Sequence, residues 1–171
     1  MRKGGGKAKG SSFEREICRR LSLWISHGSQ EDVFWRSALS GGRATVAAKK
    51  GLRLATQAGD ISAIHPLGNA FIEAFMVECK NYADLKFEGL ITGKGHLAEF
   101  WVTAKNEAIK YGKLPMLIAK QNQQPSIVFL DRKGLDVLVI KLKCCLTAPR
   151  LNLYAVLLDE FLLYAKFVGE V

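Results

Sequence analysis

Two charged side chains at the end of an apolar segment have types and a spacing that can bind and use a metal ion. The stretch FMVECKN, residues 75–81, runs from apolar residues into Glu78, Cys79 and Lys80. In a strand, residues i and i+2 project from one face, so Glu78 and Lys80 would lie together while Cys79 points into the core. By itself the pattern also fits an exposed strand end with a weak ion pair.

A third charged residue, Asp60, is expected beside this pair. Residues 60–64 and 71–79 are both strand-like, and the HPLGN sequence between them has the composition of a turn. Positions 60 and 78 are symmetric about position 69, so simple antiparallel pairing would place Asp60 opposite Glu78, with Cβ atoms about 4.5–5.5 Å apart. A β-bulge would shift this register.

Such a cluster has a definite chemistry. Two carboxylates this close repel each other unless a proton or a cation lies between them. Mg²⁺ prefers oxygen ligands, so we expect it to bind Asp60, Glu78 and the backbone carbonyl of Cys79, with Mn²⁺ as a substitute. Lys80 would orient the attacking water, lower its pKa, or neutralise charge that builds up on a phosphate.

The elements that would position this cluster alternate between helical and strand-like patterns. Apolar residues from Phe13 to Ile25 recur at helical spacing after an N-cap at Ser11 or Ser12, and Gly28 ends this helix. Besides the predicted hairpin, the expected elements are a strand at 33–37, a helix at 96–111, strands at 115–120 and 126–131, apolar runs at 135–142 and 151–158, and a helix starting near 159. We therefore predict an α/β (α+β) fold with helices flanking a mixed β-sheet.

The charge distribution favours a nucleic-acid partner. The chain has 171 residues, and 25 Lys and Arg against 16 Asp and Glu give a formal net charge of +9. Of these residues, 12 basic and 5 acidic ones lie at or before Asp60. The basic residues there lie in Gly-, Ser- and Ala-rich sequence rather than on an amphipathic stripe, which favours nucleic acid over a membrane surface. No apolar run could span a membrane and no secretory signal is present, so we expect a cytoplasmic chain.

Together these motifs resemble the PD-(D/E)xK nuclease superfamily. Gly59-Asp60 followed by Glu78-Cys79-Lys80 is similar to its signature. KGSSFERE, residues 9–16, resembles the opening of archaeal-type Holliday junction resolvases, which implies that Glu14 contributes to the metal site from the first helix. The resemblance implies a restriction-endonuclease-like core with the element order αβββαβ, followed by a C-terminal extension.

The same resemblance implies how the chain would contact DNA. WRS, residues 35–37, is similar to an Arg-Ser element on the first strand of those resolvases, which implies a place near the scissile phosphate. The basic segments would complete the DNA-binding surface through contacts to the phosphate backbone of the DNA. The expected members of this surface are Lys9, Arg36, Ser37, Arg43, Lys49, Lys50 and Arg53. The segment 38–59 is longer than in the small archaeal resolvases, and loops of this kind set what the fold cleaves.

The expected domain organisation is one domain with a basic extension. Residues 1–10 would form a flexible N-terminus, residues 11–122 the nuclease core, and residues 123–171 the strands and helix that complete the same domain.

The leading hypothesis is a Mg²⁺-dependent endodeoxyribonuclease that hydrolyses DNA phosphodiester bonds in the manner of a Holliday junction resolvase. Symmetric cutting of two strands would require a homodimer. Its place would be the nucleoid or a phage-infected cell, because small nucleases of this kind are common in phage. Two alternatives remain open: a restriction- or repair-type nuclease that acts on linear duplex DNA, and a DNA-binding module without catalysis.

Overall fold

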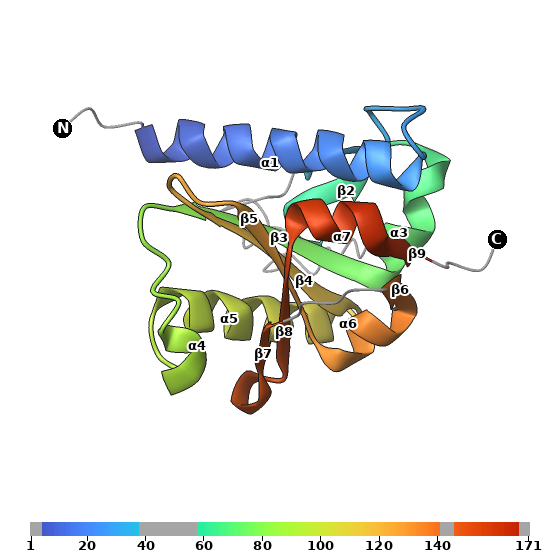
Figure 1. Cartoon of the computed structure of the whole chain (residues 1–171). Helices are drawn as coiled ribbons and strands as arrows, with labels where there is room; N and C mark the ends of the chain where they lie inside the picture. Colours follow the sequence, from blue (N-terminus) through green and yellow to red (C-terminus); the bar gives the residue numbers. More distant parts are fainter. Residues whose placement is uncertain (1–4, 38–57, 141–145, 168–171) are drawn as a thin grey trace.

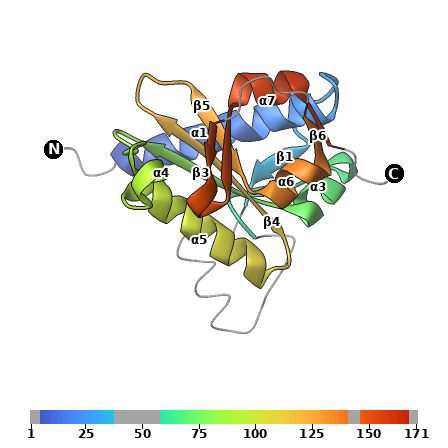
Figure 2. The same cartoon turned by 60° about the horizontal axis from the view of Figure 1, so that its bottom comes forward.

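The protein has a five-stranded mixed sheet between two layers of helices. The computed structural model describes residues 5–37, 58–140 and 146–167 (Figure 1). The strand order in the sheet is β3-β4-β5-β8-β7, with β3 and β4 parallel and the other neighbours antiparallel. Helices α1 and α7 cover one face, and α4 and α5 lie on the other (Figures 1 and 2). The predicted α/β, restriction-endonuclease-like fold is confirmed.

Helix α1 (Gly5–Ile25) packs against the sheet through residues spaced four apart. Phe13, Ile17 and Leu21 are almost completely buried, as the helical period predicts. Gly28 follows in the left-handed conformation, and its N–H donates to the carbonyl of Leu23 over 2.7 Å, which ends the helix as predicted.

The start of α1 differs from the prediction. The helix begins at Gly5, so Ser11 and Ser12 lie inside it rather than at its N-cap, and residues 5–10 belong to the helix. Lys9 Nζ donates to Asn122 Oδ1 in the connection between β4 and β5. This tertiary contact supports a helical turn that the Gly-rich composition alone does not favour.

The predicted hairpin between residues 60–64 and 71–79 is wrong. Strand β2 (Ile61–Ala63) pairs antiparallel with β1 (Phe34–Arg36), and β3 (Phe75–Tyr82) pairs parallel with β4 (Leu114–Gln121). A 3₁₀ turn, Pro66–Gly68, and helix α3 (Asn69–Ala74) separate β2 from β3.

The local sequence explains this error. His65 caps the turn because its Nδ1 accepts a hydrogen bond from the N–H of Leu67 over 3.3 Å, and Pro66 occupies the first turn position, where its missing N–H costs nothing. Phe71 and Ile72 are adjacent and both buried, which one face of a helix allows and strict strand alternation does not.

The other predicted elements are present with small shifts. The helix expected at 96–111 is α5 (His96–Lys110), the strand expected at 126–131 is β5 (Ser126–Leu130), and the closing helix is α7 (Leu158–Tyr164). The remaining elements, in chain order, are α4 (Gly89–Thr92), α6 (Arg132–Val137), β6 (Leu138–Ile140), β7 (Leu146–Ala148), a 3₁₀ turn at Pro149–Leu151, β8 (Leu153–Leu157) and β9 (Ala165–Phe167). Strands β6 and β9 form a separate two-stranded sheet.

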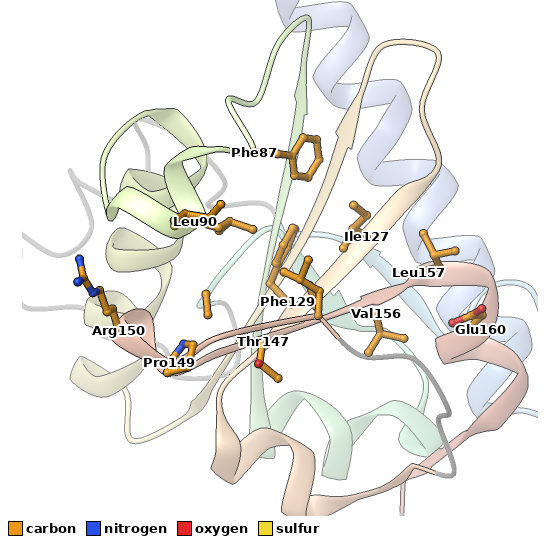
Figure 3. Close-up of a pocket in the computed structure, with 14 residues that line it drawn as sticks. Phe87, Leu90, Ile127, Phe129, Thr147, Pro149, Arg150, Val156, Leu157 and Glu160 are labelled. Atoms are coloured by element: carbon orange, nitrogen blue, oxygen red, sulfur yellow. The ribbon is translucent and has the colours of Figure 1, made fainter.

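The half of the sheet that α5 does not cover carries an apolar groove. Helix α5 packs on β3 and β4, and the groove of about 1050 Å³ lies over β5, β7 and β8, with α4 at its side (Figure 3). Arg150 and Glu160 lie at opposite ends of it, and the lining between them is mostly aliphatic and aromatic. Within the described parts of the chain, no helix has the length and apolar character needed to cross a bilayer.

Candidate active site

Asp60 is fixed by its backbone between two strands. Its N–H donates to the carbonyl of Val77 over 2.8 Å, and its carbonyl accepts from the N–H of Ser37 over 2.8 Å. Gly59 precedes it in the left-handed conformation (φ +87°), and a Cβ at that position would lie 2.6 Å from the carbonyl oxygen of Val77. The close approach of this segment to β3 therefore requires glycine immediately before the carboxylate.

The side chain of Asp60 is also anchored on β3. Asp60 Oδ2 accepts a hydrogen bond from the N–H of Cys79 over 2.8 Å. The structure therefore brings Asp60 next to Glu78 and Lys80, as expected, but through an edge contact with β3 and not through the predicted hairpin. Since β3 has its ladder partner β4 on the other side, this contact lies at the open edge of the five-stranded sheet.

Strand alternation places Glu78 and Lys80 on one face of β3. Val77 and Cys79 are buried in the core beneath α1, whereas the side chains of Glu78 and Lys80 are 24% and 28% exposed and form an ion pair with each other. This arrangement differs from a solvated strand end. Partial burial lowers the effective dielectric constant around the two charges, and this strengthens the electrostatic interaction between them.

The backbone of Cys79 directs a further oxygen to the same edge. In an extended strand the N–H and C=O of one residue point to the same side. Because the N–H of Cys79 points to Asp60, its carbonyl faces the Asp60 side of β3 as well. The Cys79 thiol lies in the core, where burial raises its pKa well above the ordinary value, so it is a neutral thiol and not a metal-binding thiolate.

The site is short of positive charge. Burial and the nearby Glu78 carboxylate raise the pKa of Asp60 to about 7, against the opposing effects of the Cys79 N–H and Lys80. Burial alone would lower the pKa of Lys80, but the attraction and hydrogen bond of Glu78, together with Asp60, raise it. Lys80 is therefore a cation, and the Asp60–Glu78 pair is a site where a proton or a metal ion is stabilised.

Glu14 approaches this site from α1 but is paired with Arg36. Its side chain is 15% exposed and accepts from Arg36 Nε, and its charge contributes to the raised pKa of Asp60. Over the described residues, no three His, Cys, Asp or Glu side chains lie close enough together to hold a metal ion. Asp60, Glu78 and the Cys79 carbonyl fit a hard, oxygen-binding cation such as Mg²⁺, and Glu14 is not placed as a third carboxylate ligand.

The expected DNA-binding residues fall into different settings. Arg36 is 30% exposed beside Glu14, and Lys9 contacts the β4–β5 turn. Ser37 is 4% exposed, and its N–H holds the carbonyl of Asp60, so its contact positions the site and does not present an open surface to phosphate. Arg43, Lys49, Lys50 and Arg53 lie outside the residues that the structure describes.

Sequence reasoning missed an aromatic group beside Lys80. Tyr82 projects from the same face of β3, and it packs with His96 and Phe100 of α5. Lys80 Nζ lies 5.7 Å from the centroid of the Phe100 ring. Tyr82 follows Lys80 by two residues, so the alternation that paired Glu78 with Lys80 could have found it.

Comparison with known proteins identifies one family. A protein-family model described as "Phage putative PDDEXK endonuclease" matches residues 5–145. No curated protein and no solved structure gives a significant match. The matched range holds the whole Asp60–Glu78–Lys80 cluster together with Glu14 and Arg36. The chain therefore belongs to this phage family of PD-(D/E)xK endonucleases.

Proposed function

We propose that the protein is a Mg²⁺-dependent endodeoxyribonuclease that cleaves branched DNA in the manner of a Holliday junction resolvase. The observation that carries the proposal is the anchoring of Asp60 on the N–H of Cys79, beside the half-buried Glu78–Lys80 pair. Membership of a PD-(D/E)xK endonuclease family supports the reaction class.

The metal-binding role falls to the oxygen atoms at the edge of β3. Asp60, Glu78 and the Cys79 carbonyl would hold Mg²⁺, or Mn²⁺ in its place, with waters and a phosphate oxygen completing the coordination. When bound, the ion would supply Lewis-acid activation of the phosphate and of a water. The cation also explains why two carboxylates are held together where burial disfavours their joint ionisation.

Lys80 acts as a cation in this scheme. Its raised pKa keeps it protonated, so it would orient the attacking water and stabilise negative charge on the phosphate rather than accept a proton. In the reaction, the water oxygen would form a bond to phosphorus and release a proton to solvent, while the bond from phosphorus to the sugar oxygen breaks and that oxygen takes up a proton from solvent. The Glu78 carboxylate holds Lys80 in place through their ion pair.

Glu14 and Arg36 form the outer part of the site. Glu14 would act on the metal through a water or through Arg36, since Arg36 occupies its carboxylate. Arg36, with its side chain 30% exposed at the edge of the site, would contact a phosphate of the bound strand. Lys9 and the basic residues of segment 38–59 would add backbone contacts.

The branched substrate and the homodimer are the finer parts of the proposal. The net charge of +9 suits a polyanion, and a four-way junction has two symmetric strands to cut, which a two-fold dimer would match with two sites. The alternatives are a nuclease of linear duplex DNA and a DNA-binding module that does not cut.

Cleavage of three substrates separates these possibilities. A four-way junction, a flap and a linear duplex of the same sequence are incubated with Mg²⁺, with Mn²⁺ and with EDTA. Preferential, metal-dependent cutting of the junction is expected, and light scattering should give the mass of a dimer. Equal cutting of all three would remove the resolvase assignment and retain the nuclease. Absence of cutting with either metal would leave only the binding module.

A matched carboxylate provides the control. Asp136→Asn removes an exposed carboxylate on α6 that pairs with Arg132 over 3.0 Å. It should cut the junction at the wild-type rate, whereas Asp60→Asn should bind DNA without cutting it.

A further inference from the structure

Three aromatic side chains form a surface directly beside the proposed catalytic lysine. Tyr82 lies two residues after Lys80 on β3, and His96 and Phe100 lie one turn apart at the start of α5. The ring centroids of Tyr82 and Phe100 are 4.9 Å apart, those of Tyr82 and His96 are 5.8 Å apart, and those of His96 and Phe100 are 6.1 Å apart. The three rings therefore form one contiguous group.

This group is not part of the closed core. Tyr82 is 42% exposed and the His96 side chain is 57% exposed, while Phe100 is partly buried against the core on the α5 face. An aromatic cluster that served packing alone would bury its ring faces, as Phe71 and Phe75 do elsewhere in the chain with no exposed surface. Here Tyr82 and His96 remain open to solvent beside Lys80.

The group is coupled to Lys80 by geometry. Lys80 Nζ lies 5.7 Å from the Phe100 centroid, at a distance where a cation is attracted to the ring. A phosphate held by Lys80 would therefore lie within one to two nucleotide rises, of about 3.4 Å each, from the aromatic surface. A base attached next to that phosphate could reach the rings.

We infer that Tyr82, His96 and Phe100 form a stacking platform for an unpaired base of the DNA strand next to the scissile phosphate. A base inside a duplex has both faces covered by its neighbours, so only an unpaired, terminal or unstacked base can use the platform. Stacking of one base on an aromatic side chain is worth about fivefold to a hundredfold in affinity. The platform thus selects DNA with a strand interruption or branch point at the cut.

The place of the platform next to the scissile phosphate rests on the proposed function, but the stacking itself is tested by DNA binding alone. Two DNAs carry 2-aminopurine, a fluorescent adenine analogue, at the same position: one unpaired at a three-way branch, the other paired in a continuous duplex. Affinity and fluorescence are measured in EDTA, so that the strands stay intact. The proteins are the wild type, Tyr82→Leu, Tyr82→Phe and Tyr164→Leu, the last removing an exposed tyrosine (49%) on α7.

The expected result is specific to the unpaired base. Tyr82→Leu should weaken binding of the branched DNA by about fivefold to a hundredfold, and change binding of the duplex by less than about twofold. Stacking should quench the unpaired 2-aminopurine on the wild type and on Tyr82→Phe, but less on Tyr82→Leu. Tyr164→Leu should match the wild type, and thermal unfolding checks that each variant is folded.

The inference is overturned if Tyr82→Leu weakens both DNAs equally, weakens neither, or leaves the quenching unchanged. Its failure is distinguishable from failure of the proposed function. A protein that never cuts DNA but shows the Tyr82-dependent preference keeps the platform and loses the nuclease. A protein that cuts with Mg²⁺ but shows no such preference keeps the nuclease and loses the platform.

Discussion

The two edges of the central sheet depart from ordinary protein surfaces in opposite ways. At the β3 edge, Asp60, Glu78 and Lys80 keep charged groups half out of water. Over β5, β7 and β8, the groove leaves hydrophobic side chains in water: Leu146 is 59% exposed and Leu157 is 40% exposed (Figure 3). Helix α5, which packs mainly on β3 and β4, lies between the two regions.

Charge is what distinguishes the two regions. Burying charge is unfavourable unless the charges are paired, and the two carboxylates of Asp60 and Glu78 share a single lysine, Lys80. The apolar groove carries no such electrostatic demand, since among the described residues that line it only Arg150 and Glu160, at its ends, are charged. Substitutions at the β3 edge should therefore change catalysis, and substitutions in the groove should not.

The largest expected effect is the loss of cleavage on neutralising Glu78. Glu78→Gln keeps the shape of the side chain but removes the proposed metal ligand and the charged partner of Lys80. Single-turnover cleavage of the best substrate should fall by about 10³-fold or more. Glu107→Gln, which also removes the carboxylate partner of a lysine but on exposed α5 surface, is the control and should cleave normally. Cleavage by Glu78→Gln within about tenfold of wild type would contradict the assignment.

Loss of the Lys80 charge should have the next largest effect. Lys80→Met should slow the chemical step by about 10²–10³-fold, because the proposed role of this cation is to stabilise charge that develops on the phosphate. Binding of DNA in EDTA should change far less than the rate. Lys110→Met is the control variant. It removes an exposed lysine at the C-terminal end of α5 that forms an ion pair with Glu107, as Lys80 does with Glu78. Equal rates for Lys80→Met and Lys110→Met would show that Lys80 has no catalytic role.

The unfavourable ionisation of Asp60 beside Glu78 should lower the free energy of unfolding when no metal ion is bound. The pKa of Asp60 is raised from 3.8 to about 7, so the protonated form is favoured in the folded state. Its contribution to stability is complete below the unfolded pKa and is lost as pH rises through about 7. In EDTA, Asp60→Asn should therefore gain stability over wild type between pH 4 and 7, reaching up to about 4 kcal/mol at pH 8, because each pKa unit corresponds to about 1.4 kcal/mol.

Urea unfolding at pH 5 and pH 8, with and without Mg²⁺, checks this prediction. Added Mg²⁺ should stabilise the wild type alone and so reduce the difference between the two proteins. A stability difference that is independent of both pH and Mg²⁺ would show that Asp60 is not under this electrostatic strain.

The smallest effects are expected in the groove. Leu157→Ser, at a position on β8 that is 40% exposed, should change the free energy of unfolding by about 0.5 kcal/mol or less. Cleavage per active site should stay within about twofold of wild type. A loss of cleavage comparable to that of Lys80→Met would show that the groove also contributes to catalysis and would contradict the distinction between the two regions.

The sequence predicted the site better than the path of the chain that builds it. Strand alternation was sufficient to separate Val77 and Cys79 from Glu78 and Lys80, because β3 has a buried face and a polar face. The long apolar periodicity of α5 predicted its bounds to within one residue. These features depend on local periodicity, which is visible in the residues themselves.

The connection of Asp60 to β3 could not be read in the same way. The segment 66–74 has both turn composition and apolar residues, and it folds as a 3₁₀ turn and helix because Phe71 and Ile72 are buried side by side. The parallel pairing of β3 with β4 joins residues about forty positions apart, which no local pattern specifies. Asp60 still reaches Cys79 because Gly59 lets the chain approach β3 closely.

The central claim is that Asp60 and Glu78 hold a divalent cation that the cleavage of DNA requires. The most direct measurement is the single-turnover rate of junction cleavage as Mg²⁺ is titrated, for the wild type and for Asp60→Asn. A saturable dependence on Mg²⁺ in the wild type is expected, with no cleavage in EDTA, and Asp60→Asn should bind the junction without cutting it. Cleavage that persists in EDTA, or an Asp60→Asn variant that cuts at the wild-type rate, would contradict the account.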